Sequence, residues 1–159
     1  MLILLFIGAF VLLIYTVFLF YKYGVPYSYS MSYYIIGQKW YFTLILWAIA
    51  FPVVFYSEYG LLFFTGAAVM FTAAAPNFMK SKTYPHITLQ RKVHMIGSYS
   101  AVVLATFSLV FNFHLYWLAG TMVVFTVVSY LLKYKNHIFW IEAVYLFGIY
   151  FVLIIRLLQ

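Results

Sequence analysis

The chain has 159 residues, of which 68% are apolar and 7% are charged, whereas a typical soluble domain carries about 25% charged residues. It has no cysteine, which excludes disulfides, thiolate catalysis and thiolate-bound metals, and its only two acids are Glu58 and Glu142. A chain whose outside is as apolar as its inside cannot stay monomeric in water. The composition therefore predicts an integral membrane protein.

Apolar runs along the chain predict an all-α bundle of six transmembrane helices in a single domain, residues 1–159. One span needs about twenty apolar residues. The forty residues from Val93 to Leu132 contain no Lys, Arg, Asp or Glu, which suits two spans joined by a tight turn. The first span lacks a basic leading region and a clear cleavage site, so we expect a retained helix rather than a signal peptide. The expected spans are about 2–21, 40–56, 61–75, 93–110, 115–132 and 138–155.

The basic residues predict the orientation of this bundle. Eight of the nine Lys and Arg fall in loops on one side, and only Arg156 falls on the other. Because cytoplasmic loops carry the excess of Lys and Arg, we expect those loops in the cytoplasm and both termini on the non-cytoplasmic side. A bacterial-type inner membrane or another plasma membrane fits this pattern. The eight residues are Lys22, Lys39, Lys80, Lys82, Arg91, Lys92, Lys133 and Lys135.

The distribution of Lys and Arg also indicates which binding partners to expect. Topology and anionic lipid explain the formal net charge of +7, so nucleic acid is not expected as a partner. Membrane lipid is the expected partner, with anionic headgroups at Lys80, Lys82, Arg91 and Lys92. A homo-oligomer or a larger membrane partner is also open.

Glu142 is the residue that the sequence singles out for chemistry, because it lies one to two turns inside the last span. A carboxylate there is costly, and such groups usually face a bundle interior, a partner or water. We expect a catalytic role as proton acceptor, or a role as cation site or metal ligand. The alternative is a shallow carboxyl that is paired with Lys135 or another basic loop residue, or that is protonated.

Arg91, His94 and Ser98 lie around the start of the fourth span, and His137 lies at the start of the sixth. His94 is the expected second catalytic residue, as ligand or general base, and Arg91, His137 and Ser98 are expected binding residues. If the fold brings the two helices together, His94, His137 and Glu142 suffice as ligands for zinc or another divalent ion. Otherwise these histidines are interfacial and bond to the backbone or to lipid phosphate.

The segment Tyr27–Tyr34 alternates Ser with aromatic residues. It could be a re-entrant lid that supplies hydroxyls to a pocket, or an anchor in the headgroup zone. The number of Tyr residues favours the anchor, because Tyr prefers the membrane interface.

The stretch Val93–Ser98 (VHMIGS) resembles the His-x-x-Gly-Ala helix start of six-helix membrane proteins of the Frag/DRAM/Sfk type and related bacterial families of unknown function. The match covers six residues, and Ser98 stands in place of the Ala. The resemblance implies a compact six-helix bundle, a buried polar pocket near His94 and a link to lipid or membrane homeostasis. It implies no particular reaction.

Together these patterns predict a multi-pass membrane protein with a cytoplasm-facing polar site that handles a lipid or a small solute. One alternative is a metal-dependent membrane lipid hydrolase, and another is a structural or accessory subunit with no site of its own. A transporter would need oligomerisation or internal pseudosymmetry. Haem ligation by His94 and His137 is disfavoured because both residues lie near the membrane surface.

Overall fold

The computed structural model describes residues 2–56, 60–77 and 88–159, and every regular element within these ranges is helical. This confirms the all-α prediction. A four-residue helix and a π-helical turn, which the sequence patterns did not predict, join the longer helices. The elements are α1 (Leu2–Tyr23), α2 (Ser32–Ile35), α3 (Trp40–Phe55), α4 (Gly60–Ala74), α5 (Leu89–Phe107), η1 (Ser108–Asn112), α6 (Tyr116–Leu132) and α7 (His137–Leu158).

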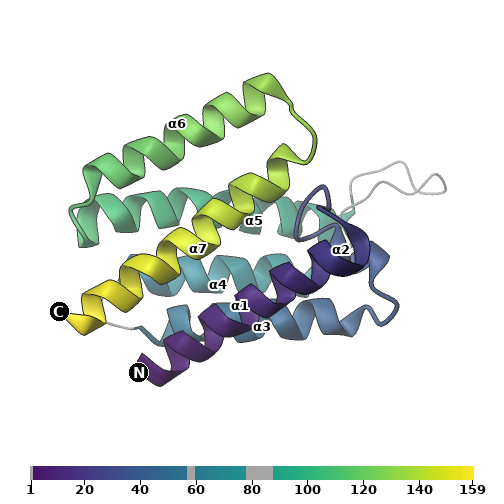
Figure 1. The fold of residues 1–159 in the computed structure, drawn as a ribbon, viewed down its shortest axis with the longest axis horizontal. Helices are drawn as coiled ribbons and strands as arrows, with labels where there is room; N and C mark the ends of the chain where they lie inside the picture. Colours follow the sequence, from purple (N-terminus) through teal and green to yellow (C-terminus); the bar gives the residue numbers. More distant parts are fainter. Residues whose placement is uncertain (1, 57–59, 78–87) are drawn as a thin grey trace.

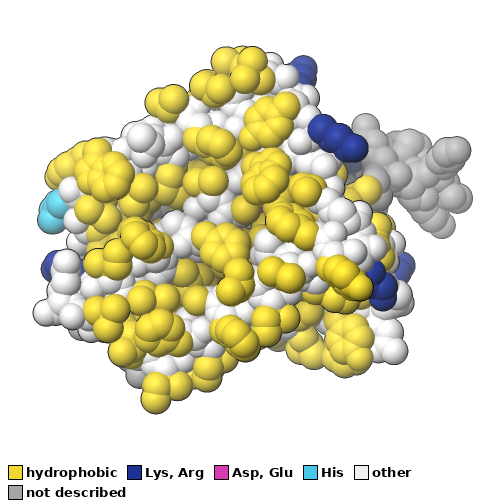
Figure 2. All heavy atoms as spheres, in the orientation of Figure 1, with side chains coloured by type: hydrophobic (Ala, Val, Ile, Leu, Met, Phe, Trp, Pro, Cys, Tyr) yellow, Lys and Arg dark blue, Asp and Glu magenta, His cyan; other side chains and the backbone are white. Residues whose placement is uncertain are grey.

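Three helical stretches among the described residues are long and apolar enough to cross a membrane: α1, α5 continued by η1, and α7. The apolar helices α3, α4 and α6 are shorter, with 16, 15 and 17 residues. Large apolar side chains are exposed along these helices, and Figure 2 shows them over the broad face of the molecule, with Lys and Arg toward its ends. Such a surface suits lipid rather than water.

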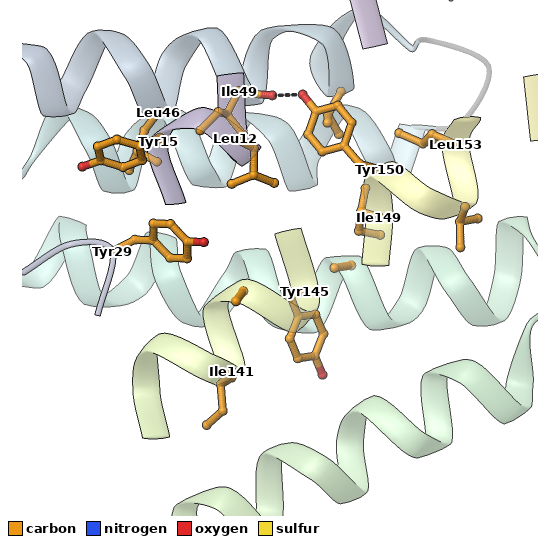
Figure 3. Packing of buried hydrophobic residues seen from close by; sticks show 14 of the residues in the cluster. Leu12, Tyr15, Tyr29, Leu46, Ile49, Ile141, Tyr145, Ile149, Tyr150 and Leu153 are labelled. Atoms are coloured by element: carbon orange, nitrogen blue, oxygen red, sulfur yellow. Dashed lines mark hydrogen bonds between the residues drawn. The ribbon is translucent and has the colours of Figure 1, made fainter. Parts of the chain in front are cut away.

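The long helices run back and forth, so that both termini lie at one end of the bundle (Figure 1). The 24–39 connection and the α6–α7 turn lie at the opposite end. In space, α1 packs on α3, α3 on α4 and α4 on α5, and the circuit closes through η1, α6 and α7 back to α1. This ring surrounds the buried core, which Figure 3 shows from close by.

The spacing of apolar side chains explains how α1 faces this core. Leu5, Leu12, Tyr15 and Leu19 are all nearly inaccessible to solvent, and their spacings of seven, three and four place them on one stripe of a helix. The opposite face of α1 exposes Ile3, Phe6 and similar side chains.

Small residues bring the middle helices close together. A Cβ atom on Gly66 would lie 2.9 Å from the Val54 backbone nitrogen, and one on Gly97 would lie 3.0 Å from Ala68 O. Glycine lets the backbones of membrane helices approach this closely. Helices α3, α4 and α5 are therefore closely packed on one another, whereas α5 and α7 make few contacts.

Candidate functional site

The connection between α1 and α2 docks on the first turns of α7, and we call Val25–Met31 the docking segment. Three of its alternate residues each use one backbone group to bond α7 or the turn before it. The pairs are Val25 O with Asn136 Nδ2 at 2.7 Å, Tyr27 O with Phe139 N at 2.9 Å, and Tyr29 N with Glu142 Oε2 at 2.6 Å. The contacts satisfy a first-turn amide of α7, which has no partner inside its own helix.

Hydroxyl groups fix the other side of the docking segment to α1. Thr16 gives its single hydroxyl proton to Leu12 O, so the Tyr29 hydroxyl donates to Thr16 Oγ1 at 2.7 Å. Ser32 donates to Tyr29 O, and the Tyr15 hydroxyl therefore donates to Ser32 Oγ. Burial raises the pKa of the Tyr29 phenol well above its ordinary value, which keeps it a neutral donor.

Aromatic packing adds to these bonds. The Tyr29 ring stacks on Phe139, with centroids 4.5 Å apart, and Phe139 is fully buried. Ser28, Ser30 and Ser32 are buried as well. The segment therefore buries its serines, as the lid interpretation expects, whereas Tyr27 is 49% exposed, as the anchor interpretation expects.

The turn before α7 offers a test of this docking. Asn136 adopts a left-handed conformation (φ 62°) and donates to Val25 O. We expect Asn136→Ala to lower the free energy of unfolding by about 2 kcal/mol, because it adds left-handed strain and removes the bond. Asn136→Gly keeps the backbone conformation and should lose only the bond. Titrating the purified variants with a denaturing detergent measures both changes, and equal losses in the two variants would contradict the assignment.

A pocket with a cavity of about 100 Å³ lies behind the docking segment, between α3, α4, α5 and α7. Tyr29 and Tyr150 lie toward opposite ends of this region in Figure 3, with Ile49 and Ile149 near Tyr150. Glu142 lies at the Tyr29 end and lines the pocket. Along α7, the eight residues from Glu142 to Tyr150 correspond to about 12 Å.

Apart from Ser30, the hydroxyls on the pocket walls already donate to protein oxygens. Thr65, Thr72 and Ser98 each bond the carbonyl four residues earlier in their helix, at 2.7, 2.9 and 2.9 Å, and Tyr150 donates to Ile49 O. Figure 3 marks this last bond with a dashed line. The remaining wall is mostly Leu, Ile, Val and Ala. The pocket is thus apolar except at the end that Glu142 occupies.

Glu142 presents an acceptor to this pocket. Its Oε2 accepts from Tyr29 N, and no described residue bonds its Oε1. Ser30 also lines the pocket, and its hydroxyl makes no hydrogen bond within the described ranges. Among the described lining residues, none is Lys, Arg or His. The alternative considered from the sequence, a pair between Glu142 and Lys135, is not seen, and the carboxylate accepts from the Tyr29 amide instead.

His94 lies elsewhere. Its Nδ1 is 2.9 Å from Thr72 O and 3.0 Å from Ala75 O, and because both carbonyls can only accept, Nδ1 carries the proton. The ring thereby satisfies carbonyls at the C-terminal end of α4. His94 does not line the pocket, so the structure does not assemble the predicted catalytic pair of His94 and Glu142. Ser98 lines the pocket, although its hydroxyl donates to His94 O.

The predicted metal centre is not formed either. The described part of the chain holds no group of three or more His, Asp or Glu side chains that could bind a metal ion. His137 is turned to the α6–α7 connection, with Nδ1 3.1 Å from Tyr134 O, and its ring meets Tyr27 edge-on. His94 and His137 therefore each serve a local backbone group, and the prediction that they join Glu142 as ligands is wrong.

Arg91 is placed at the start of α5, outside the pocket. Thr88 caps this helix, accepting from Arg91 N at 3.2 Å. The Arg91 Nη1 atom is buried and has no hydrogen-bond partner among the described residues. Lys92 is exposed. The other predicted headgroup contacts, Lys80 and Lys82, lie outside the described residues, as does Glu58.

No family model matches the chain, and neither a curated protein nor a solved structure does. The resemblance to the Frag/DRAM/Sfk-type proteins stays a prediction. Sequence reasoning found Glu142 by its depth, but it missed Tyr29 and Ser30 as its neighbours. The alternating Ser and Tyr of that segment were the available signal.

Proposed function

We propose that this chain is a six-span membrane protein that binds a lipid-like amphiphile in the pocket lined by Glu142. The polar head of the ligand would lie at the docking segment, and its apolar part would lie toward Tyr150. The observation that carries the proposal is a carboxylate with one unbonded oxygen at the end of an otherwise apolar pocket. An ionisable group inside a membrane protein usually has a functional partner.

The proposed topology has six spans, with basic loops in the cytoplasm and both termini outside. Each expected span coincides with an apolar helix. The shorter helices, at about 1.5 Å per residue, fall below the usual 30 Å of hydrocarbon, which local bilayer thinning can accommodate. The described basic residues of the loops lie at one end, and Arg156 lies near the chain terminus at the other.

Binding of an amphiphile agrees better with these contacts than the alternatives do. A metal-dependent hydrolase needs a ligand set that His94, His137 and Glu142 do not form. A purely structural subunit gives no reason for an unpaired acceptor inside a pocket. It would tolerate Glu142→Gln, and it would bind no ligand between α5 and α7.

Photocrosslinking tests the proposal. The protein in lipid nanodiscs would be irradiated with a long-chain lipid analogue that carries a diazirine in its chain, and the labelled residues would be mapped by mass spectrometry. We expect labels at pocket residues such as Leu46, Val102 and Ile149, and excess unlabelled lipid should suppress them. Labels only on lipid-facing side chains would contradict the proposal.

A matched pair of variants separates the pocket from the lipid-facing surface. Ala101 lines the pocket, and Val103 on the same helix is 49% exposed outside it. Ala101→Phe should fill the cavity and remove the pocket labels, whereas Val103→Phe should leave them unchanged. Equal labelling of both variants would show that the labels do not come from a ligand in the pocket.

A further inference from the structure

The polar end of the pocket offers acceptors and no fixed positive charge. Glu142 Oε1 and Ser30 Oγ both belong to lining residues and lack partners within the described ranges. The other lining hydroxyls do not donate to Glu142, because Thr72, Ser98 and Tyr150 give their protons to backbone carbonyls, and Ser30 makes no hydrogen bond to the carboxylate. A ligand head that completes this end must therefore bring a donor for Glu142 Oε1, whereas the Ser30 hydroxyl can either accept or donate.

The charge of Glu142 further restricts which ligand head can bind. An ionised carboxylate in a low-dielectric pocket is costly, and it either takes up a proton or pairs with a cation. No described Lys, Arg or His lines the pocket to serve as that cation. A carboxylate or phosphate head would face repulsion from Glu142, and an alcohol would supply one neutral donor. A primary ammonium supplies three donors together with the opposite charge.

We propose that the ligand is a long-chain primary amine, whose ammonium group donates to Glu142 Oε1 and Ser30 Oγ. This inference rests on the proposed amphiphile pocket and specifies its ligand class. In this arrangement Tyr29 N holds Glu142 Oε2 and so aims the carboxylate at the ammonium group. Ser30 Oγ can accept a second N–H of the same ammonium group, which adds a hydrogen bond to the charge-assisted one at Glu142.

The size of the cavity supports a small head. Its volume of about 100 Å³ is below the roughly 150 Å³ of an engineered cavity that binds benzene. The pocket is only partly enclosed, so it can hold an ammonium group and the first carbons of a chain while the rest of the chain extends out of it. A quaternary ammonium is bulkier and has no N–H donor, so it should bind poorly despite its charge.

Competition against the photoreactive lipid measures this selectivity. Decylamine, 1-decanol and decyltrimethylammonium would compete with the probe in nanodiscs of uncharged lipid, with each competitor quantified per lipid. We expect decylamine to displace the probe at about tenfold lower membrane concentration than either other compound, because a charge-assisted bond exceeds a neutral one by that order. Equal potency of the amine and the alcohol would overturn the inference.

Three single-residue variants test which side chains give the preference for the amine over the alcohol. Glu142→Gln keeps an acceptor for Tyr29 N and so should keep the segment docked, but the preference for the amine over the alcohol should disappear. Ser30→Ala should weaken the binding of both compounds, because the Ser30 hydroxyl can accept from an ammonium group and donate to an alcohol oxygen. Thr65→Val is the matched control, because Thr65 lines the pocket while its hydroxyl bonds Leu61 O, and the preference should stay unchanged.

The outcomes distinguish the two proposals. If none of the three compounds displaces the probe from the pocket residues, both the pocket and its ligand class fail. If they compete but the amine shows no advantage, or keeps its advantage in Glu142→Gln, the ligand class fails and the amphiphile pocket stands. The comparison of primary and quaternary amines in the unmodified protein tests the ligand class without any variant.

Discussion

Replacing Phe139 with Ala is expected to lower the free energy of unfolding by about 3 kcal/mol and to release the docking segment. Phe139 is fully buried, its ring stacks on Tyr29, and it also packs against Phe20 with centroids 5.5 Å apart. Truncation would leave a cavity between the segment and the two helices that hold it. Because Tyr29 also positions Glu142, ligand binding should weaken together with stability.

Two measurements check this result. Unfolding of the purified protein in mixed micelles gives the change in free energy, and hydrogen exchange of the Tyr29 amide reports whether its bond to Glu142 persists. Phe151→Ala is the control, because Phe151 lies on the same helix and is 64% exposed. Fast exchange at Tyr29 in the Phe139 variant only would support the docking role. A stable, protected Phe139→Ala protein would contradict it.

Replacing Gly97 with Val is expected to cost about 3 kcal/mol by forcing α5 away from α4. A Cβ atom at this position would lie 2.6 Å from Thr72 Oγ1, 3.0 Å from Ala68 O and 3.1 Å from Thr72 N. Two of these atoms belong to the backbone, so a side-chain rotation cannot relieve the overlap. Thr72 also lines the pocket, and its carbonyl accepts from His94, so the damage should reach both features.

Gly120→Val is the matched control for this prediction. A Cβ atom on Gly120 would meet no atom within 4 Å, so the change should alter stability by less than about 1 kcal/mol. The same micelle titration compares the two variants. Equal stability of Gly97→Val and Gly120→Val would show that the α4–α5 contact is looser than these distances indicate.

Helix positions were predictable because each apolar run has a single low-cost conformation in a membrane. Backbone polar groups must be bonded inside the segment, which favours a helix wherever about twenty residues lack charge. The last expected span, 138–155, became α7 (His137–Leu158), extended by a few residues at its C-terminal end. The π-helical turn η1 was not predictable, because a π-turn differs from an α-turn by one register step and the sequence pattern is the same.

The functional site was only partly predictable. The depth of Glu142 marked it as unusual, and the structure places it in a pocket. The grouping of His94 and His137 with it failed, because each imidazole can satisfy a nearby carbonyl at low cost: His94 bonds the end of α4, and His137 bonds Tyr134 O. The carbonyl that His94 bonds lies far away in the chain, and the one that His137 bonds lies in the preceding turn. The spacing of residues in the sequence reports neither contact.

The sequence by itself determined that this chain forms apolar helices suited to a membrane and that one carboxyl lies within the last of them, because composition and run length fix both properties. Only the tertiary structure decided what that carboxyl faces. The docking segment begins more than a hundred residues earlier in the chain, yet its Tyr29 amide bonds Glu142. Packing of α1 and α7 around that segment brings the two groups together, and a contact of this kind depends on the whole ring of helices.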